Sequence, residues 1–449
     1  MKILLAGGQL CREEGLAPGD LLIADGKIAA CGDCRGLAGD AEVIDAAGAY
    51  VLPGLIDLHV HLDDRISGFL LADDYESGSR VALQNGITTI GGFITQGGEE
   101  TLAEAVGRAR SRAQGRCHTD YLWHLTPTRF GPEDWPEIRR FAEHGWRTFK
   151  FYTTYRESGI YTAYDQLAEI MERLKPFGAR FLVHAEDDAM LQRLAARCPG
   201  RDAAAHARMR PAAVEQAAVE RLLLIAAATG APLHFVHIST AAAAERILAA
   251  KGDAAVTCET GPHYLFLDES WLQRQDGHRW LCTPPLRPAV EAKALRRLAR
   301  QGAFDLYASD HCPFRRADKD AGAADSRRVP KGIAGVGALA PLVFQLYGGE
   351  PGTAFPEMSR RLAANPARAA GIYPIKGALQ PGSDADLLVL TVSATDREIV
   401  SGGGDAYETY PGWRTPLRVR DLFLRGRPLI RNGVPLPMTE PQGRCLWPS

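Results

Sequence analysis

The chain has 449 residues, of which 46% are hydrophobic and 24% are charged, the balance of an ordinary globular protein. Its 52 Lys and Arg nearly cancel its 54 Asp and Glu, and the formal net charge is −2. Without a basic tract to attract a polyanion, nucleic acid is not an expected partner. No segment reaches the roughly 20 consecutive apolar residues that span a bilayer, so membrane association is not expected either.

The nine cysteines are an odd number scattered over a long chain. Disulfide frameworks are typical of short secreted chains with an even number of cysteines. The N-terminal apolar run is too short for a signal peptide, so we predict reduced thiols and a cytoplasmic location. Cys31 and Cys34 have the spacing of redox and zinc motifs, but no second pair accompanies them. We interpret this segment as a turn between strands.

Both ends of the chain have the pattern of short strands and tight turns. Residues 21–28 place the hairpin dipeptide Asp25-Gly26 between apolar stretches, and residues 382–390 and 419–433 show the same alternation. We therefore predict a small β-sandwich domain assembled from both termini, comprising residues 1–52 plus 375–449.

Between these ends, short apolar runs alternate with stretches of helical period such as residues 164–174, 213–228 and 241–250. Eight parallel strands, each followed by a helix, make a (β/α)₈ TIM barrel, an α/β fold. We predict such a barrel over residues 53–374. The eight runs are Gly54–His59, Ile87–Phe93, Tyr121–Leu125, Arg147–Tyr152, Arg180–His184, Leu233–His237, Ala255–Glu259 and Phe304–Asp310.

Five of the eight runs carry a residue that can bind a metal or move a proton. The first ends at His59 and continues to His61, and residues two apart on a strand share a face, so both imidazoles can reach one ion. The carboxyl ends of barrel strands surround a single mouth, where active sites form. The other runs bring Lys150, His184, His237 and Asp310 to that mouth, which predicts a metal site.

Each of these residues also has an ordinary structural explanation. A His-x-His pair occurs by chance on surfaces, and a lone histidine after an apolar strand is often a core residue. Lys150 can extend its amine past the strand end, and Asp310 can cap the next helix. Five such residues at the same end of one set of strands favour the metal site over five separate coincidences.

Lys150 lies between Phe149 and Phe151. Burial of an ammonium costs free energy and favours the neutral amine, which can combine with carbon dioxide to form a carbamate. The resulting N6-carboxylysine would bridge two divalent ions about 3.5–4 Å apart, as in two-metal hydrolytic sites. Ligands rich in imidazole and free of thiolate suit Zn²⁺ best, with Mn²⁺ or Co²⁺ as alternatives.

Several motifs occur in a characteristic order along nearly the whole chain. Gly54-Leu-Ile-Asp-Leu-His-Val-His61 comes first, and His184-Ala-Glu186 follows Lys150. Cys258-Glu-Thr-Gly-Pro-His-Tyr264, Cys282-Thr-Pro-Pro-Leu-Arg287 and Ser309-Asp-His-Cys-Pro-Phe314 come later. In this order the chain resembles the amidohydrolase superfamily and, within it, the dihydropyrimidinase/hydantoinase family.

This resemblance implies hydrolytic opening of a cyclic amide or imide, of the hydantoin or dihydropyrimidine type, by a hydroxide that bridges two metal ions. It also implies a homodimer or homotetramer. The implied ligands of the first ion are His59, His61 and Asp310, those of the second are His184 and His237, and carboxylated Lys150 bridges the two.

The resemblance also implies roles outside the metal shell. Asp310 would pass a proton from the hydroxide to the leaving ring nitrogen, and Tyr155 would donate a hydrogen bond to the developing oxyanion. Tyr155, Thr283 and Lys331 stand where the family binds substrate.

The chain departs from relatives at a few positions. Asp63 stands where dihydroorotases carry the arginine that grips a substrate carboxylate, and Lys331 stands where hydantoinases usually carry asparagine. An allantoinase- or dihydroorotase-like activity on a substrate with an acidic substituent is therefore an alternative. Some relatives have lost their metal ligands and act as assembly or signalling proteins, but this chain keeps all six ligand positions.

The loop after His61 contains the apolar residues Ile66, Phe69, Leu70 and Leu71. One hypothesis is that they line a pocket for the substituent of the substrate ring, since loops at the barrel mouth commonly determine specificity. The alternative is that they pack the loop onto the barrel.

Overall fold

The computed structural model describes residues 2–437 and 440–447. Eight strands form one sheet in which all pairings are parallel. Val60 and His311, which follow the first and last strands, form a parallel bridge that closes the ring. The predicted TIM barrel is confirmed. Its strands are β6 (Leu55–Asp57), β9 (Ile87–Thr95), β10 (Asp120–Thr126), β11 (Thr148–Tyr152), β12 (Arg180–His184), β13 (Leu233–Phe235), β14 (Val256–Thr260) and β15 (Leu306–Tyr307).

Amphipathic helices follow most barrel strands. In α4 the residues Leu167, Ile170, Met171 and Leu174 are buried, the i, i+3, i+4, i+7 spacing of one helix face. No helix in the described residues combines the length and apolar character needed to cross a membrane. The helices are α1 (Tyr75–Gln84), α2 (Leu102–Ala113), α3 (Trp135–Glu143), α4 (Tyr164–Leu174), α5 (Asp188–Arg197), α6 (Ala203–Met209), α7 (Ala212–Thr229), α8 (Ala241–Ala250), α9 (Pro262–Phe266), α10 (Ala289–Arg300), α11 (Arg316–Ala321), α12 (Leu339–Leu346), α13 (Pro351–Ser359) and α14 (Asn365–Ala370).

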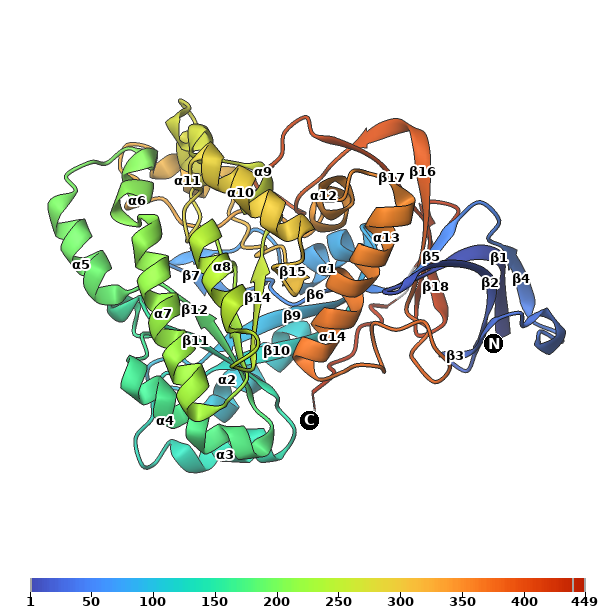
Figure 1. Ribbon diagram of the computed structural model, residues 1–449, viewed down its shortest axis with the longest axis horizontal. Coiled ribbons are helices and arrows are strands. Elements are labelled where there is room, and N and C mark those ends of the chain that lie inside the picture. Colours follow the sequence, from blue (N-terminus) through green and yellow to red (C-terminus); the bar gives the residue numbers. More distant parts are fainter. Residues whose placement is uncertain (1, 438–439, 448–449) are drawn as a thin grey trace.

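Strands from both termini form a second, mixed sheet of nine strands, which Figure 1 shows in blue and red beside the barrel. Strand β5 pairs antiparallel with β16, which joins the two ends of the chain. Asp25 and Gly26 both have positive φ, as a two-residue hairpin turn requires. The strands are β1 (Lys2–Arg12), β2 (Gly15–Ala24), β3 (Lys27–Gly32), β4 (Glu42–Asp45), β5 (Tyr50–Pro53), β16 (Leu387–Glu398), β17 (Arg414–Leu424), β18 (Arg427–Arg431) and β19 (Val434–Pro435).

A buried ion cluster links this terminal sheet to the barrel. The ammonium of Lys376 lies 2.6 Å from Asp120, 2.9 Å from Asp384 and 2.7 Å from Asp386. Asp120 begins barrel strand β10, whereas Asp386 immediately precedes β16 of the terminal sheet. Arg425 also pairs with Asp120. The three carboxylates are thus neutralised by protein cations, and the cluster fixes the terminal sheet against the barrel.

Candidate metal centre

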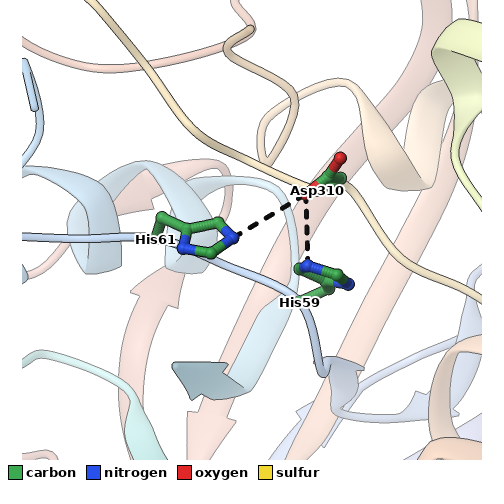
Figure 2. A group of neighbouring side chains, drawn as sticks. All are labelled: His59, His61 and Asp310. Atoms are coloured by element: carbon green, nitrogen blue, oxygen red, sulfur yellow. Dashed lines mark ion pairs between the residues drawn. The ribbon is translucent and has the colours of Figure 1, made fainter. Parts of the chain in front are cut away.

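Three predicted ligands meet where the first and last barrel strands end. His59 and His61 follow β6, Asp310 follows β15, and both imidazoles point toward the carboxylate (Figure 2). Oδ1 of Asp310 lies 3.2 Å from Nε2 of His59 and 3.9 Å from Nε2 of His61. Burial lowers the pKa of His59 to about 4 and holds that of His61 well below its usual range. Both rings are therefore neutral, the form that binds metals.

A second pair of histidines comes from β12 and the segment after β13. Nδ1 of His184 lies 2.9 Å from Nε2 of His237. Burial lowers the pKa of both imidazoles, and Nδ1 of His237 is buried without a hydrogen-bond partner. Because Nδ1 of His184 and Nε2 of His237 face each other on neutral rings, these two nitrogens suit a shared ion.

Lys150 lies in β11 and is only 1% exposed. Its Nζ is 5.3 Å from the ring centre of Phe93 and 5.0 Å from that of Tyr152. Burial lowers the pKa of the amine to about 7, opposed by the charges of Glu259 and Asp310. The charge of Lys150 in turn lowers the pKa of all four histidines, so Lys150 lies near both histidine pairs.

Two carboxylates that the sequence analysis did not assign hold the histidines in place. Oε1 of Glu259 accepts a hydrogen bond from Nδ1 of His59 at 2.6 Å, and Oε2 of Glu186 lies 2.8 Å from Nε2 of His184. Arg210 pairs with Glu186. Carboxylates on the second nitrogen of a ligand histidine fix its orientation and its proton position. Glu259 ends the seventh predicted strand run, so its position at a strand end was a usable signal.

The predicted substrate residues Tyr155 and Thr283 lie beside the second histidine pair. The Tyr155 ring centre is 5.1 Å from that of His184. Burial raises the pKa of the Tyr155 phenol, and the nearby Thr283 side chain opposes that shift. The Thr283 hydroxyl is also 3.2 Å from Nε2 of His206. Tyr155 has a φ of 68°, a strained conformation of the kind often retained at functional sites.

Lys331 lies further out, on the loop after α11. Its ammonium donates to the Arg327 carbonyl at 3.0 Å. The next residue, Gly332, donates its backbone N–H to the Leu281 carbonyl at 2.9 Å, which ties this loop to the segment that carries Thr283.

His263, at the start of α9, is a further buried histidine that the sequence analysis left unassigned. It is 1% exposed, and neither ring nitrogen has a hydrogen-bond partner. Glu259 faces the barrel interior. Gly261 follows two residues later on extended backbone, so positions 259 and 261 point to the same face. A Cβ at Gly261 would lie 2.4 Å from Cε1 of His263. The imidazole thus occupies the interior space that a side chain at position 261 would fill.

The apolar loop after His61 forms a small hairpin of β7 (Arg65–Ile66) and β8 (Phe69–Leu70). Ile66 and Phe69 pack against a buried cluster of Leu71, Cys312 and Phe314. Leu70 is 41% exposed. The loop therefore packs onto the segment that follows Asp310. For Ile66 and Phe69 this agrees with the alternative that the apolar residues pack the loop onto the barrel.

A closed (β/α)₈ barrel with four neutral imidazoles, a buried lysine and an aspartate at its mouth defines a metal-dependent TIM-barrel hydrolase. The model of the Amidohydrolase family matches residues 50–427, and the chain belongs to this family.

Individual relatives agree with this assignment. The chain is 32% identical over 446 residues to D-hydantoinase from Streptomyces coelicolor, covering 96% of this chain and 94% of that protein. It is 33% identical over 400 residues to D-phenylhydantoinase from Escherichia coli, covering 87% and 86% of the two chains. The crystal structure of dihydropyrimidinase from Brevibacillus agri superposes with a TM-score of 0.91 at 28% identity, covering 100% and 99%. The predicted resemblance is confirmed.

Proposed function

We propose that this protein hydrolyses the ring amide bond of a cyclic amide or imide of the hydantoin or dihydropyrimidine type. The convergence of four neutral histidines, Lys150 and Asp310 at one barrel mouth carries this proposal. The hydantoinases and the dihydropyrimidinase to which the chain is similar support the choice of a cyclic amide.

The proposed metal site holds two divalent ions, with zinc the best match to imidazole and carboxylate donors. His59, His61 and Asp310 would bind one ion, and His184 and His237 the other. Lys150 would bridge them as a carbamate, formed when its neutral amine bonds to the carbon of CO₂ and loses a proton. The bound ions would polarise the ring carbonyl and lower the pKa of water.

The remaining roles belong to the chain's own side chains. Asp310 accepts a proton from the attacking water and delivers it to the ring nitrogen as the C–N bond breaks. Tyr155 stays protonated because burial raises its pKa, so it donates a hydrogen bond to the oxygen on which negative charge develops. Thr283 and the loop at Lys331 hold the ring amide.

We also propose that the protein is a cytoplasmic homodimer or homotetramer. Exposed apolar side chains often mark an interface between subunits, and the neighbouring helices α7 and α8 expose Leu224 at 72% and Leu248 at 43%. Light scattering coupled to gel filtration measures the assembly, and a monomer would contradict this part of the proposal.

The function is tested with a panel of hydantoin, dihydrouracil, allantoin, dihydroorotate and succinimide. Protein loaded with Zn²⁺ and bicarbonate should open the hydantoin or the dihydrouracil ring, with the open carbamoyl acid detected by mass spectrometry. Full metal content without turnover of any ring would refute the proposal. Native protein that contains no metal and takes none up would favour a non-catalytic relative.

A further inference from the structure

Two lysines, Lys319 and Lys331, lie near the turn that carries Thr283, and the proposed reaction assigns no role to their charges. Lys319 is 0% exposed, and its ammonium donates to the Leu281 carbonyl at 3.0 Å. That same carbonyl accepts the backbone N–H of Gly332 at 2.9 Å, so Lys319 and the backbone next to Lys331 are both tied to a point two residues before Thr283.

Neither lysine forms an ion pair in the part of the chain that the structure describes. The carboxylates nearest to these lysines in the sequence form ion pairs with arginines: Asp320 binds Arg279 at 2.7 Å, and Asp325 binds Arg327 at 2.5 Å. This arrangement contrasts with Lys376, a buried lysine surrounded by three carboxylates within 2.9 Å. Burial lowers the pKa of Lys319 to about 7 and that of Lys331 to about 8, so an anion at this position would stabilise their charged forms.

The excess positive charge reaches the presumed substrate side of the metal centre. Burial and then the charge of Arg210 lower the pKa of Lys331, and the charge of Lys331 lowers the pKa of His206. His206 hydrogen-bonds Thr283, and the Arg210 guanidinium lies 5.4 Å from the Tyr155 ring centre. Since Glu186 already neutralises Arg210, the charge of the lysines is left uncompensated.

We propose that the cyclic substrate carries an anionic substituent of the carboxylate class, which lies against Lys331 beside Thr283. This inference rests on the proposed ring-opening function and narrows its substrate class. Lys331 interacts directly with the carboxylate, and Lys319 adds positive potential from behind. A second role for the cations, stabilising the carboxylate that every ring opening creates, would not discriminate between substituents.

Matched substrates distinguish these roles. 5-(Carboxymethyl)hydantoin and its neutral isostere 5-(carbamoylmethyl)hydantoin differ only in charge and hydrogen-bond donors. We expect the metal-loaded enzyme to prefer the carboxylate by roughly tenfold to a hundredfold in kcat/KM, the range of one charge-assisted hydrogen bond, mainly through KM. Raising the salt concentration should reduce the kcat/KM of the carboxylate substrate and leave that of the amide nearly unchanged.

Variants then assign the preference to Lys331. Lys331→Met should bring the ratio of the two kcat/KM values close to one, whereas Lys331→Arg should keep the preference. Lys293→Met is the matched control, because Lys293 is exposed on the outer helix α10, and its ratio should equal that of the wild type.

Each outcome is decisive. If the wild type opens both rings equally well, or if Lys331→Met keeps the preference, the inference is wrong while the ring-opening function stands. If neither these rings nor the unsubstituted ones open, the proposed function itself fails. Should Lys331→Met not fold, loss of the preference in high salt and its retention in Lys331→Arg still test the inference.

Discussion

Lys150 and the four histidines of the metal centre have lowered pKa values because burial disfavours their charged forms. The same burial raises the pKa of Tyr155 and keeps its phenol protonated. In the mechanism proposed above, this one physical cause would prepare the imidazoles as ligands, the amine as a nucleophile for CO₂ and the phenol as a hydrogen-bond donor. Glu259 and Glu186 are charged exceptions, since histidine and arginine partners hold their pKa values below the usual range despite burial.

The first prediction concerns the proposed bridge. Lys150→Ala removes the amine that would form the carbamate, so the variant should lose most of its bound metal and its turnover. Short-chain carboxylates such as propionate should restore part of the activity by occupying the vacated space. Elemental analysis and initial rates measure both effects, with Lys293→Ala on the surface as the control. Normal metal content together with a normal rate in Lys150→Ala would remove Lys150 from the site.

The second prediction concerns proton transfer. Asp310→Asn preserves the shape of the side chain but removes the proton acceptor. Turnover should fall by at least about 10²-fold while much of the metal stays bound. Rates measured on samples of known metal content separate loss of the acceptor from loss of metal. An unchanged rate per bound metal would show that Asp310 does not carry the proton.

At the scale of elements, the candidate site residues lie at or just after the carboxyl ends of the barrel strands. Comparing the predicted and observed bounds shows which features the sequence predicts. The bounds of α4 and α8 agree with the predicted helical stretches because their apolar spacing is regular. The runs predicted for β13 and β15 extended to His237 and Asp310. The strands end earlier, at Phe235 and Tyr307. His237 and Asp310 have φ of 40° and 49°, a left-handed conformation that the sequence pattern did not predict.

Long-range pairs were equally inaccessible from the sequence. Glu259 and His59 are 200 positions apart, and only the closed barrel brings their side chains to hydrogen-bond distance. The strand count was predictable because eight apolar runs are local features. The hydrogen-bond partner of each histidine was not predictable, because it depends on which strand ends the closed barrel brings together.

The third prediction tests the junction between β14 and α9. Gly261→Ala places a methyl group within 2.4 Å of the buried His263 ring, which must then move. Overpacking of this kind typically costs about 1–3 kcal/mol. We expect a lower melting temperature than for Gly252→Ala, where no atom lies within 4 Å of the new Cβ. Equal melting temperatures for the two variants would show that His263 relocates freely.

The fourth prediction concerns the hairpin of β7 and β8. The Phe69 ring packs against that of Phe314, with 6.4 Å between the ring centres. Phe314 lies four residues after Asp310. Phe69→Ala should loosen the hairpin at a cost of roughly 1–2 kcal/mol and reduce kcat/KM by similar factors for hydantoin and phenylhydantoin. Leu70→Ala, at an exposed position, is the control. A loss confined to phenylhydantoin would instead place Phe69 in a substituent pocket.

At the scale of the whole molecule, the chain closes on itself, because β5 and β16 pair although more than 300 residues separate them. The strand character of both ends was predictable, whereas the pairing of those ends was not encoded in any local pattern. We propose that residues 1–52 plus 375–449 form one domain and residues 53–374 the barrel. The Lys376 cluster joins these two parts, since its carboxylates come from both.

The last prediction tests that junction. Lys376→Met leaves the carboxylates of Asp120, Asp384 and Asp386 without their shared cation, and Asp120 and Asp386 are buried. Removing one partner of a buried charge cluster typically costs about 3–5 kcal/mol. The variant should melt at a lower temperature than the wild type at pH 7. The unpaired carboxylates will have pKa values raised above those of the unfolded chain, so their penalty is relieved when they take up protons as the pH falls. The difference in melting temperature should therefore be smaller at pH 5 than at pH 7. Lys27→Met provides the control, because Lys27 also binds Asp384 but its side chain is 48% exposed, and a surface pair contributes at most about 1 kcal/mol. A difference that is equally large at both pH values would mean that Lys376 stabilises the junction through packing of its methylene chain and not through its charge.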